Sequence, residues 1–327
     1  MFTLLLVFLN LAERRDSNTI QYLLLILLSM SAQMLNCSEK NKPEPTFPKG
    51  SIDEIAWSPD GSKIAIEYCP LMLDTIIDQY QSIIDSAGLW FINRDGSNLK
   101  MFLPGHFVGL DYHPDGTKII TAGYEINIID SSLTYLPWVW GLPRYSPDGS
   151  KVLCSNFVGD SAGIWIASID GTYKRRLGIE GYFGDWAPNG REIVCARWPH
   201  EPTPLVIADT SGTIIKELPL PPTYASMPIL WPPSFSPDGT KILFEYNTDS
   251  LLSDWQIYVI NRDGTGLEQL TEDGGRCPVW SPDGKKIAYI KYSYWGSEEA
   301  GDGQLWVMNA DGSGKTQLTF VKPKGEK

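Results

Sequence analysis

A five-residue motif recurs six times along the chain and limits the fold more than any other feature of the sequence. Each copy has an aromatic residue, a variable residue, Pro, Asp or Asn, and Gly. The copies occupy residues 57–61, 112–116, 145–149, 186–190, 235–239 and 280–284. Pro presets φ at the first corner of a turn, Asp or Asn can hydrogen-bond its own backbone, and Gly supplies the positive φ that closes a tight hairpin. Each motif therefore predicts a hairpin between two strands.

Further strands follow from what surrounds these motifs. A β-branched residue stands five positions after each motif proline, at Ile64, Ile119, Val152, Ile193, Ile242 and Ile287. A second strand-and-turn element ending in Asp-Gly is clear at residues 89–96, 164–171, 257–264 and 305–312, and weaker at 126–132 and 205–212. Short apolar segments such as 267–271 and 316–320 supply a fourth strand. Each of the six units is therefore expected to contain four strands.

Units of this size, ~40 to 50 residues, are typical of four-stranded propeller blades. One blade cannot bury both of its faces, whereas radial packing of six blades does so and leaves only short exposed edges. The sequence thus predicts an all-β fold, a six-bladed β-propeller of four-stranded antiparallel blades. We expect it to span residues 51–320, with residues 321–327 as a C-terminal tail.

The repeated units resemble those of the TolB-type, WD-like propeller family, whose repeats carry Pro-Asp-Gly turns. The resemblance covers about residues 51–320 and rests on all six copies. It implies a periplasmic or surface-exposed propeller that typically binds other proteins. TolB itself carries an α/β domain before its propeller, whereas here we expect only a leader and a tether, so the resemblance extends to the propeller alone.

The N-terminal region is typical of an export signal. Neither of its apolar runs, residues 2–9 and 22–28, reaches the roughly 18 residues of a membrane-spanning helix. Arg14 and Arg15 precede the second run and small residues follow it, which predicts an export leader over residues 1–36. Residues 34–37, Met-Leu-Asn-Cys, resemble a bacterial lipobox, which implies lipidation at Cys37. The Pro-rich residues 37–50 are expected to form an extended tether.

The formal net charge of −12 and the pI of about 4.8 argue against a nucleic-acid partner. Apart from Cys37, the chain has four cysteines, Cys69, Cys154, Cys195 and Cys277. Cys154 and Cys195 occupy equivalent positions in successive units, roughly a sheet spacing of ~10 Å apart, which is too far for a disulfide. We expect buried free thiols.

Two kinds of connection predict the functional side of the disc. The tight first and third turns of every unit lie on one side, here called the turn face. The irregular connections lie on the other side, here called the loop face, and this side is the predicted binding surface. The longer ones are residues 69–88, 156–163, 198–204, 219–233, 247–254 and 292–303.

Aromatic and charged residues of the loop face are the candidate binding residues. The aromatic candidates are Phe107, Trp138, Trp140, Tyr182, Trp198, Trp231, Tyr294 and Trp295. Each could instead pack between blades, whereas several exposed rings near the channel would suit a protein partner. The charged candidates, near the start of the innermost strands, are Asp111, Arg144, Asp185 and Arg276. They could ring the channel mouth for recognition or form ion pairs between neighbouring blades.

These features favour an exported, envelope-associated or secreted binding protein, periplasmic or on the cell surface and held at the membrane only by an N-terminal lipid. A protein or peptide is the expected partner. The alternative is a glycan, either bound at the channel mouth or acted on there by a lyase or hydrolase. The sequence has no Gly-x-Ser-x-Gly motif. Of its histidines only His106 and His200 fall on the loop face, so we predict neither a catalytic residue nor a metal or other cofactor.

Overall fold

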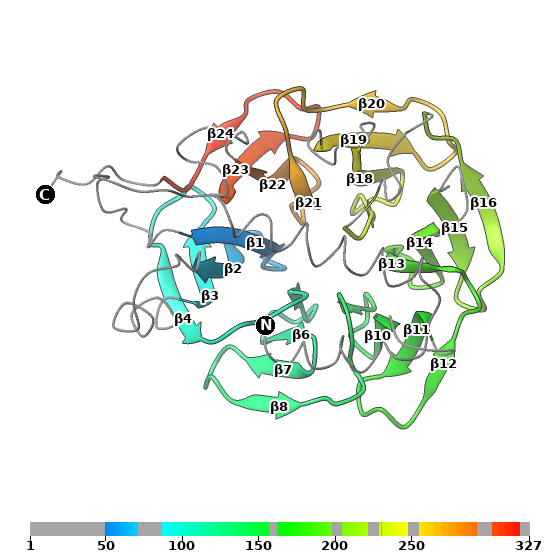
Figure 1. Ribbon diagram of the computed structural model, residues 1–327, viewed down its shortest axis with the longest axis horizontal. Coiled ribbons are helices and arrows are strands. Elements are labelled where there is room, and N and C mark those ends of the chain that lie inside the picture. Colours follow the sequence, from blue (N-terminus) through cyan, green and yellow to red (C-terminus); the bar gives the residue numbers. More distant parts are fainter. Residues whose placement is uncertain are drawn as a thin grey trace, which may run out of the picture.

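The computed structural model describes residues 50–70, 87–156, 162–197, 205–221, 229, 231–247, 255–292 and 303–320. These residues form six four-stranded antiparallel sheets arranged as blades around a centre (Figure 1). The predicted fold class, a six-bladed all-β propeller, is confirmed. In the described part of the chain no helix is long and apolar enough to cross a membrane.

The strands follow the sequence blade by blade. Blade 1 holds β1 (Gly50–Trp57), β2 (Lys63–Pro70), β3 (Gly88–Asn93) and β4 (Lys100–Pro104). Blade 2 holds β5 (Asp111–Tyr112), β6 (Lys118–Thr121), β7 (Tyr124–Asn127) and β8 (Leu133–Tyr135). Blade 3 holds β9 (Arg144–Tyr145), β10 (Lys151–Asn156), β11 (Gly163–Ser168) and β12 (Lys174–Arg176).

Blade 4 holds β13 (Gly181–Trp186), β14 (Glu192–Arg197), β15 (Leu205–Asp209) and β16 (Ile214–Leu218). Blade 5 holds β17 (Ser234–Phe235), β18 (Lys241–Asn247), β19 (Trp255–Asn261) and β20 (Glu268–Gln269). Blade 6 holds β21 (Arg276–Trp280), β22 (Lys286–Tyr292), β23 (Gly303–Asn309) and β24 (Thr316–Gln317).

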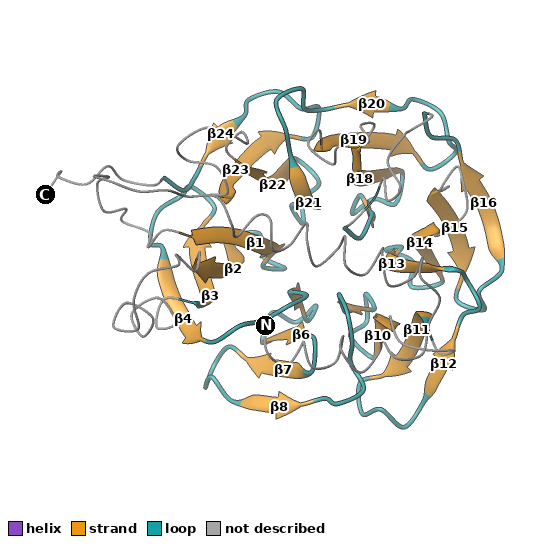
Figure 2. Ribbon diagram, viewed as in Figure 1, coloured by secondary structure: helices purple, strands orange, loops and turns teal. Residues whose placement is uncertain are grey.

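Each blade is continuous in sequence, because every described sheet pairs four consecutive strands. The first strand lies toward the centre and the fourth runs along the rim (Figure 2). The innermost strand of blade 1 is β1. Residues 43–49, whose pairing with the last blade would have contradicted this arrangement, lie outside the described residues.

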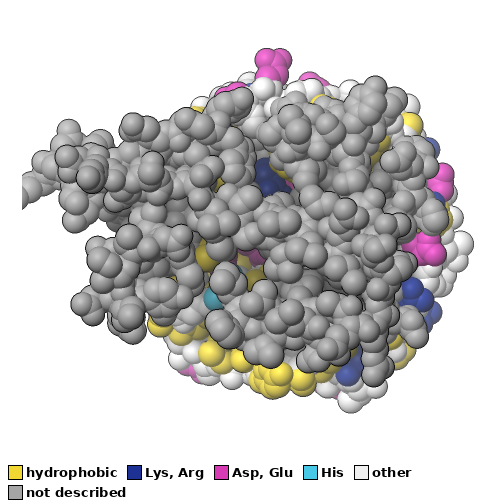
Figure 3. Space-filling model, viewed as in Figure 1, with side chains coloured by type: hydrophobic (Ala, Val, Ile, Leu, Met, Phe, Trp, Pro, Cys, Tyr) yellow, Lys and Arg dark blue, Asp and Glu magenta, His cyan; other side chains and the backbone are white. Residues whose placement is uncertain are grey.

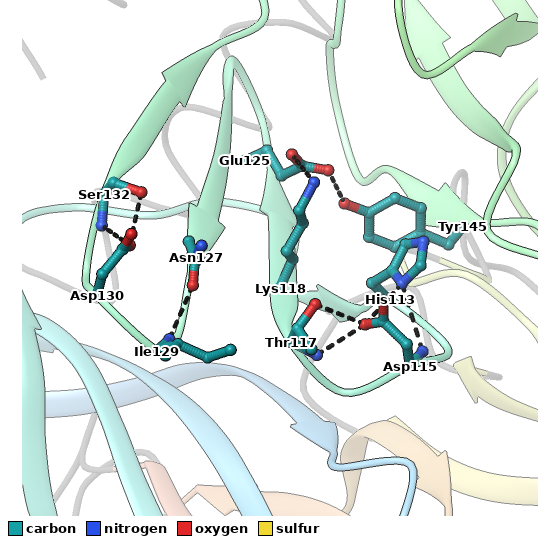
Figure 4. A network of polar contacts seen from close by, with 10 residues as sticks. All are labelled: His113, Asp115, Thr117, Lys118, Glu125, Asn127, Ile129, Asp130, Ser132 and Tyr145. Carbon is teal, nitrogen blue, oxygen red and sulfur yellow. Dashed lines mark hydrogen bonds and ion pairs between the residues drawn. The ribbon is translucent and has the colours of Figure 1, made fainter.

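The turn motifs have the predicted local chemistry. The motif glycines have φ between +64° and +75°, a region that L-residues with a side chain rarely adopt. In blade 2, Asp115 Oδ1 accepts hydrogen bonds from the backbone N–H (2.8 Å) and the hydroxyl (2.7 Å) of Thr117 (Figure 4). His113 lies in the same turn, 2.9 Å from Asp115, which places it on the turn face as predicted.

The ring is closed by side-chain packing between the first and last blades. Around the turn face the motif glycine of five of the six blades lies beside the motif proline of the preceding blade, as Gly116 does beside Pro59, whereas Gly149 lies beside His113. Gly61 of blade 1 lies in the same way beside Pro282 of blade 6. At the rim, Leu318, just after the last strand, lies beside Gly96 of blade 1. Among the described strands, no blade takes a strand from the opposite end of the chain.

The core lies in the layers between blades. The six β-branched residues that follow the turns are all 0% exposed, and five of the six motif aromatics are 5–7% exposed. Neighbouring blades also share polar contacts: Tyr145 of blade 3 donates its hydroxyl proton to Glu125 of blade 2, at 2.7 Å (Figure 4). Cys154, Cys195 and Cys277 are buried free thiols, as predicted, whereas Cys69 is only half-buried.

Candidate functional site

The aromatic candidates divide into exposed and buried rings. Trp140, in the β8–β9 connection, is 39% exposed. Trp231, just before β17, is partly buried against the hydrophobic cluster shared by blades 6 and 1. The structure describes neither Trp198, Tyr294 and Trp295 nor the side chain of Tyr182, so these four predictions lie outside the described part of the chain. Of the aromatic candidates that the structure describes, only Trp140 and Trp231 remain available to a partner.

Phe107 and Trp138, predicted as rings of the binding face, are instead core residues. Phe107 is 6% exposed in the cluster between blades 1 and 2. Trp138 is 9% exposed in the cluster between blades 2 and 3, where its ring lies beside Gly171 and under the ammonium group of Lys174. Both fill space between blades because each connection crosses from the rim of one blade to the centre of the next.

Three of the four charged candidates lie together on consecutive inner strands. Asp111 of β5 accepts a hydrogen bond from the backbone N–H of Tyr145 in the next blade, at 2.7 Å. Arg144 of β9, 9% exposed, donates to the carbonyl oxygens of Leu110 (3.3 Å) and Pro143 (2.9 Å). Burial raises the pKa of Asp111 to about 7 although Arg144 acts to lower it. This group therefore ties blades 2 and 3 together.

Asp185 of β13 continues the series into blade 4. Its carboxylate accepts a hydrogen bond from the N–H of Trp186 at 2.7 Å, and the Trp186 indole N–H donates to the carbonyl of Arg144 at 3.1 Å. Burial raises the pKa of Asp185 to about 6, and Arg144 acts in the opposite direction. Arg144 thus lies between two acidic groups from its two neighbouring blades.

The fourth charged candidate, Arg276 of β21, belongs to a different cluster. Glu245 of β18, which is 0% exposed, accepts hydrogen bonds from the backbone N–H of Cys277 (2.9 Å) and from the Arg276 guanidinium (3.4 Å). The guanidinium carbon lies 4.7 Å from the ring centre of Trp255 and 5.9 Å from that of Tyr292. Burial acts to lower the pKa of Arg276, but the charge of Glu245 holds it above the ordinary value.

Blade 1 contributes acidic residues that the sequence reasoning missed. Glu54 of β1, 4% exposed, accepts a hydrogen bond from the backbone N–H of Leu110 in blade 2, at 2.6 Å. Glu67 of β2, with 2% of its side chain exposed, lies 2.7 Å from Nδ1 of His106. The close contact with the Glu67 carboxylate raises the pKa of His106, whose own side chain is 58% exposed. Burial and the nearby Glu67 raise the pKa of Asp53 to about 7.

A signal for two of these residues was present in the repeat itself. Glu67 and Glu245 both stand eight residues after the motif proline, where the other units have Ala122, Ser155, Ala196 and Ile290. A buried position that is acidic in two of six units departs from the repeat for a reason that packing alone does not supply. Among the described residues, no group of three or more His, Cys, Asp and Glu side chains is arranged to hold a metal ion.

The protein is thus a six-bladed β-propeller with buried charged residues on the inner strands of its blades. Its fold is that of the TolB-like propellers. It superposes on TolB of Acinetobacter baumannii with a TM-score of 0.60 and 17% identity, over 86% of this chain and 67% of that one. It superposes on a candidate TolB of Agrobacterium tumefaciens with a TM-score of 0.57 and 21% identity, over 68% and 84% of the two chains.

Sequence comparison adds one relative of unknown role. An uncharacterised protein of Agrobacterium fabrum is 24% identical over 211 residues, which is 58% of this chain and 56% of that protein. No protein-family model matches the sequence. At these identities the likeness concerns the fold.

Proposed function

We propose that the protein is an exported β-propeller of the cell envelope, or a secreted one, that binds a protein or peptide partner on its loop face and channel mouth. The contrast between the two faces carries the proposal. On the turn face, the repeated Asp-Gly and Pro-Asp-Gly hairpins satisfy their own polar groups, as Asp60 does with Ser62 and Asp311 does with Ser313. That face offers little that differs from blade to blade.

The loop face differs from blade to blade. Figure 3 shows acidic, basic and histidine side chains near the centre of one side of the disc, and hydrophobic side chains along the edge where Figure 1 places β7 and β8. Trp140 is exposed and Trp231 is half-buried, while His106 lies in the irregular connection after β4 and Arg276 is the first residue of β21. Aromatic and Arg side chains are the commonest anchors of protein interfaces.

Trp140→Ala is expected to weaken partner binding by roughly 1–4 kcal/mol, because truncation of a buried interface anchor costs about that much. The measurement is a pull-down with the purified protein, followed by titration of the captured partner, with a glycan array run in parallel. Ser62→Ala and Ser313→Ala, on the turn face, serve as controls and should bind like the unaltered protein.

The fold of each variant is checked by circular dichroism and thermal melting. A folded Trp140→Ala protein that binds normally, while a turn-face variant loses the partner, would assign binding to the wrong side. Binding to glycans without a protein partner would favour the carbohydrate alternative.

The envelope location rests on residues 1–50, of which only Gly50 lies inside the described part of the chain. The proposal is that residues 1–36 direct export, that Cys37 becomes the lipidated N-terminus, and that residues 37–50 link it to the propeller. Cys37→Ser is expected to move the protein from the membrane fraction to the soluble exported fraction. Mass spectrometry of the N-terminus measures acylation directly. A full-length cytosolic product would contradict both export and lipidation.

A further inference from the structure

Two irregular inner strands meet at the boundary between blades 6 and 1. The pairing of β1 with β2 shifts register between Ile52 and Glu54, which leaves Asp53 in a bulge. The pairing of β21 with β22 shifts between Arg276 and Val279. β-Bulges re-aim side chains and are frequent beside functional sites.

The two bulges are in contact. The Sγ atom of Cys277 lies 3.6 Å from the carbonyl oxygen of Asp53. Cys277 has a φ of +51°, one of three non-glycine residues with positive φ in the described chain. Such a conformation is uncommon for a side chain without a local hydrogen-bonding group and persists only where the surrounding structure enforces it. The surrounding structure therefore holds the backbone of Cys277, the residue after Arg276, in an unfavourable conformation.

Arg276 is positioned for a further acceptor. One N–H of its guanidinium reaches Glu245 at 3.4 Å, whereas its buried Nε has no hydrogen-bond partner among the described residues. Its side chain is 16% exposed and lies against the rings of Trp255 and Tyr292, which restrict its movement. A guanidinium that is fixed in place and keeps donors beyond its pair with Glu245 can bind a second carboxylate.

Two basic side chains whose charges both act on Asp53 lie near this boundary: Arg276 at the start of β21, and His106 in the connection that leads from β4 to blade 2. The imidazole of His106 is 58% exposed, while Glu67, its acidic partner, is 2% exposed. Arg276 is 16% exposed, while Glu245, its acidic partner, is 0% exposed. In both pairs the carboxylate is the more buried member and the basic group is the more exposed one. The junction therefore presents the Arg276 guanidinium, and His106 as a second donor when it is protonated, although the chain has a net charge of −12.

We propose that the junction of blades 6 and 1 is a carboxylate-binding site, in which Arg276 and His106 donate hydrogen bonds to an acidic group of a protein partner. This inference rests on the proposed binding function and names the chemistry of its contact. Asp53, whose pKa both His106 and Arg276 act to lower, would oppose an anion only when ionised. Burial and the nearby Glu67 hold the pKa of Asp53 at about 7, so at neutral pH a large fraction of this carboxyl carries a proton and can donate to the ligand.

Three peptides test the site by NMR of the histidine ring signals, since the chain has only three histidines. Acetyl-Glu-Glu-amide carries side-chain carboxylates, acetyl-Gln-Gln with a free end carries a terminal one, and acetyl-Gln-Gln-amide carries none. At least one of the two peptides with carboxylates should shift the His106 signal saturably and raise the pKa of His106, which also faces Glu67 and Asp53. Acetyl-Gln-Gln-amide, which has no carboxylate, should do neither. The same response to all three peptides, or no response to any, would overturn the proposal.

Substitutions test whether the acidic peptide binds at Arg276 and His106 rather than elsewhere on the protein. Arg276→Gln and His106→Gln should each weaken binding of the responding acidic peptide, by roughly tenfold or more for Arg276→Gln. Arg94→Gln, an exposed arginine in the turn between β3 and β4, is the control and should not change it. Because Arg276→Gln leaves Glu245 buried without its cation, Arg276→Lys is included; it keeps the charge but loses the planar fork, and an intermediate loss is expected.

The same variants distinguish failure of the site from failure of the function. Wild-type peptide affinity in folded His106→Gln and Arg276→Lys proteins would overturn the carboxylate site, and if both still capture the protein partner, the binding function stands. If the unaltered protein captures no partner, the proposed function fails whatever the peptides do.

Discussion

Glu245→Ala is expected to lower the free energy of unfolding by about 3–5 kcal/mol, because it removes one side of a buried ion pair and leaves the other uncompensated. Glu245 is fully buried and accepts hydrogen bonds from both the backbone of Cys277 and the Arg276 guanidinium. The variant loses both contacts, so the packing of blade 5 against blade 6 is less stable. Urea unfolding followed by tryptophan fluorescence measures the loss.

Glu217→Ala provides the matched control. Glu217 also pairs with an arginine, Arg197, at 2.9 Å, but 60% of its side chain is exposed. Exposed pairs of this kind contribute about 0–1 kcal/mol. If Glu245→Ala costs no more than Glu217→Ala, the boundary between blades 5 and 6 does not depend on this buried contact.

The stability of the protein is expected to fall as the pH rises from about 5 to 8.5, with Glu54 a major contributor. Burial, followed by the charge of Glu67, raises the pKa of Glu54 from 4.5 to about 8. The folded state therefore binds a proton that the unfolded state has already released, so this contribution is present below about pH 4.5 and is lost as the pH passes 8. At about 1.4 kcal/mol for each pKa unit, the change is roughly 3–5 kcal/mol.

Glu54→Gln isolates this contribution because the amide stays neutral and its oxygen can still accept from the N–H of Leu110. The variant should lose less stability than the unaltered protein between pH 5 and 8.5, measured by urea unfolding at each pH. Parallel pH profiles for the two proteins would show that Glu54 is ionised in the folded state, contrary to this account.

The propeller could be predicted because the residues that specify each hairpin are adjacent in sequence and recur in every blade. Each Pro-Asp-Gly turn is specified by four or five adjacent residues, and the β-branched residue after it is fully buried in all six blades. Six repetitions then leave few ways to bury both faces of every sheet. The separation of tight turns from irregular connections follows from the alternation of strand direction.

The residues of the candidate site were harder to predict because their roles depend on contacts between blades. Phe107 and Trp138 are aromatic residues of the kind that often anchor protein interfaces. The direction in which each side chain points is nevertheless set by where its connection meets the next blade, as the approach of Trp138 to Gly171 shows. The bulge at Asp53 and the pairing of Glu67 with His106 join segments that share no sequence pattern. Only the departure of Glu67 and Glu245 from their own repeat pointed to them.

Site-specific photo-crosslinking tests the central claim, that the loop face and channel mouth bind the partner, most directly. A photoreactive amino acid is placed at Trp140 or His106 on the loop face and at Ser62 or Ser313 on the turn face, and the four proteins are irradiated with the captured partner. The account predicts covalent adducts from Trp140 or His106 and none from the two serine positions. Adducts from Ser62 or Ser313 alone would contradict it.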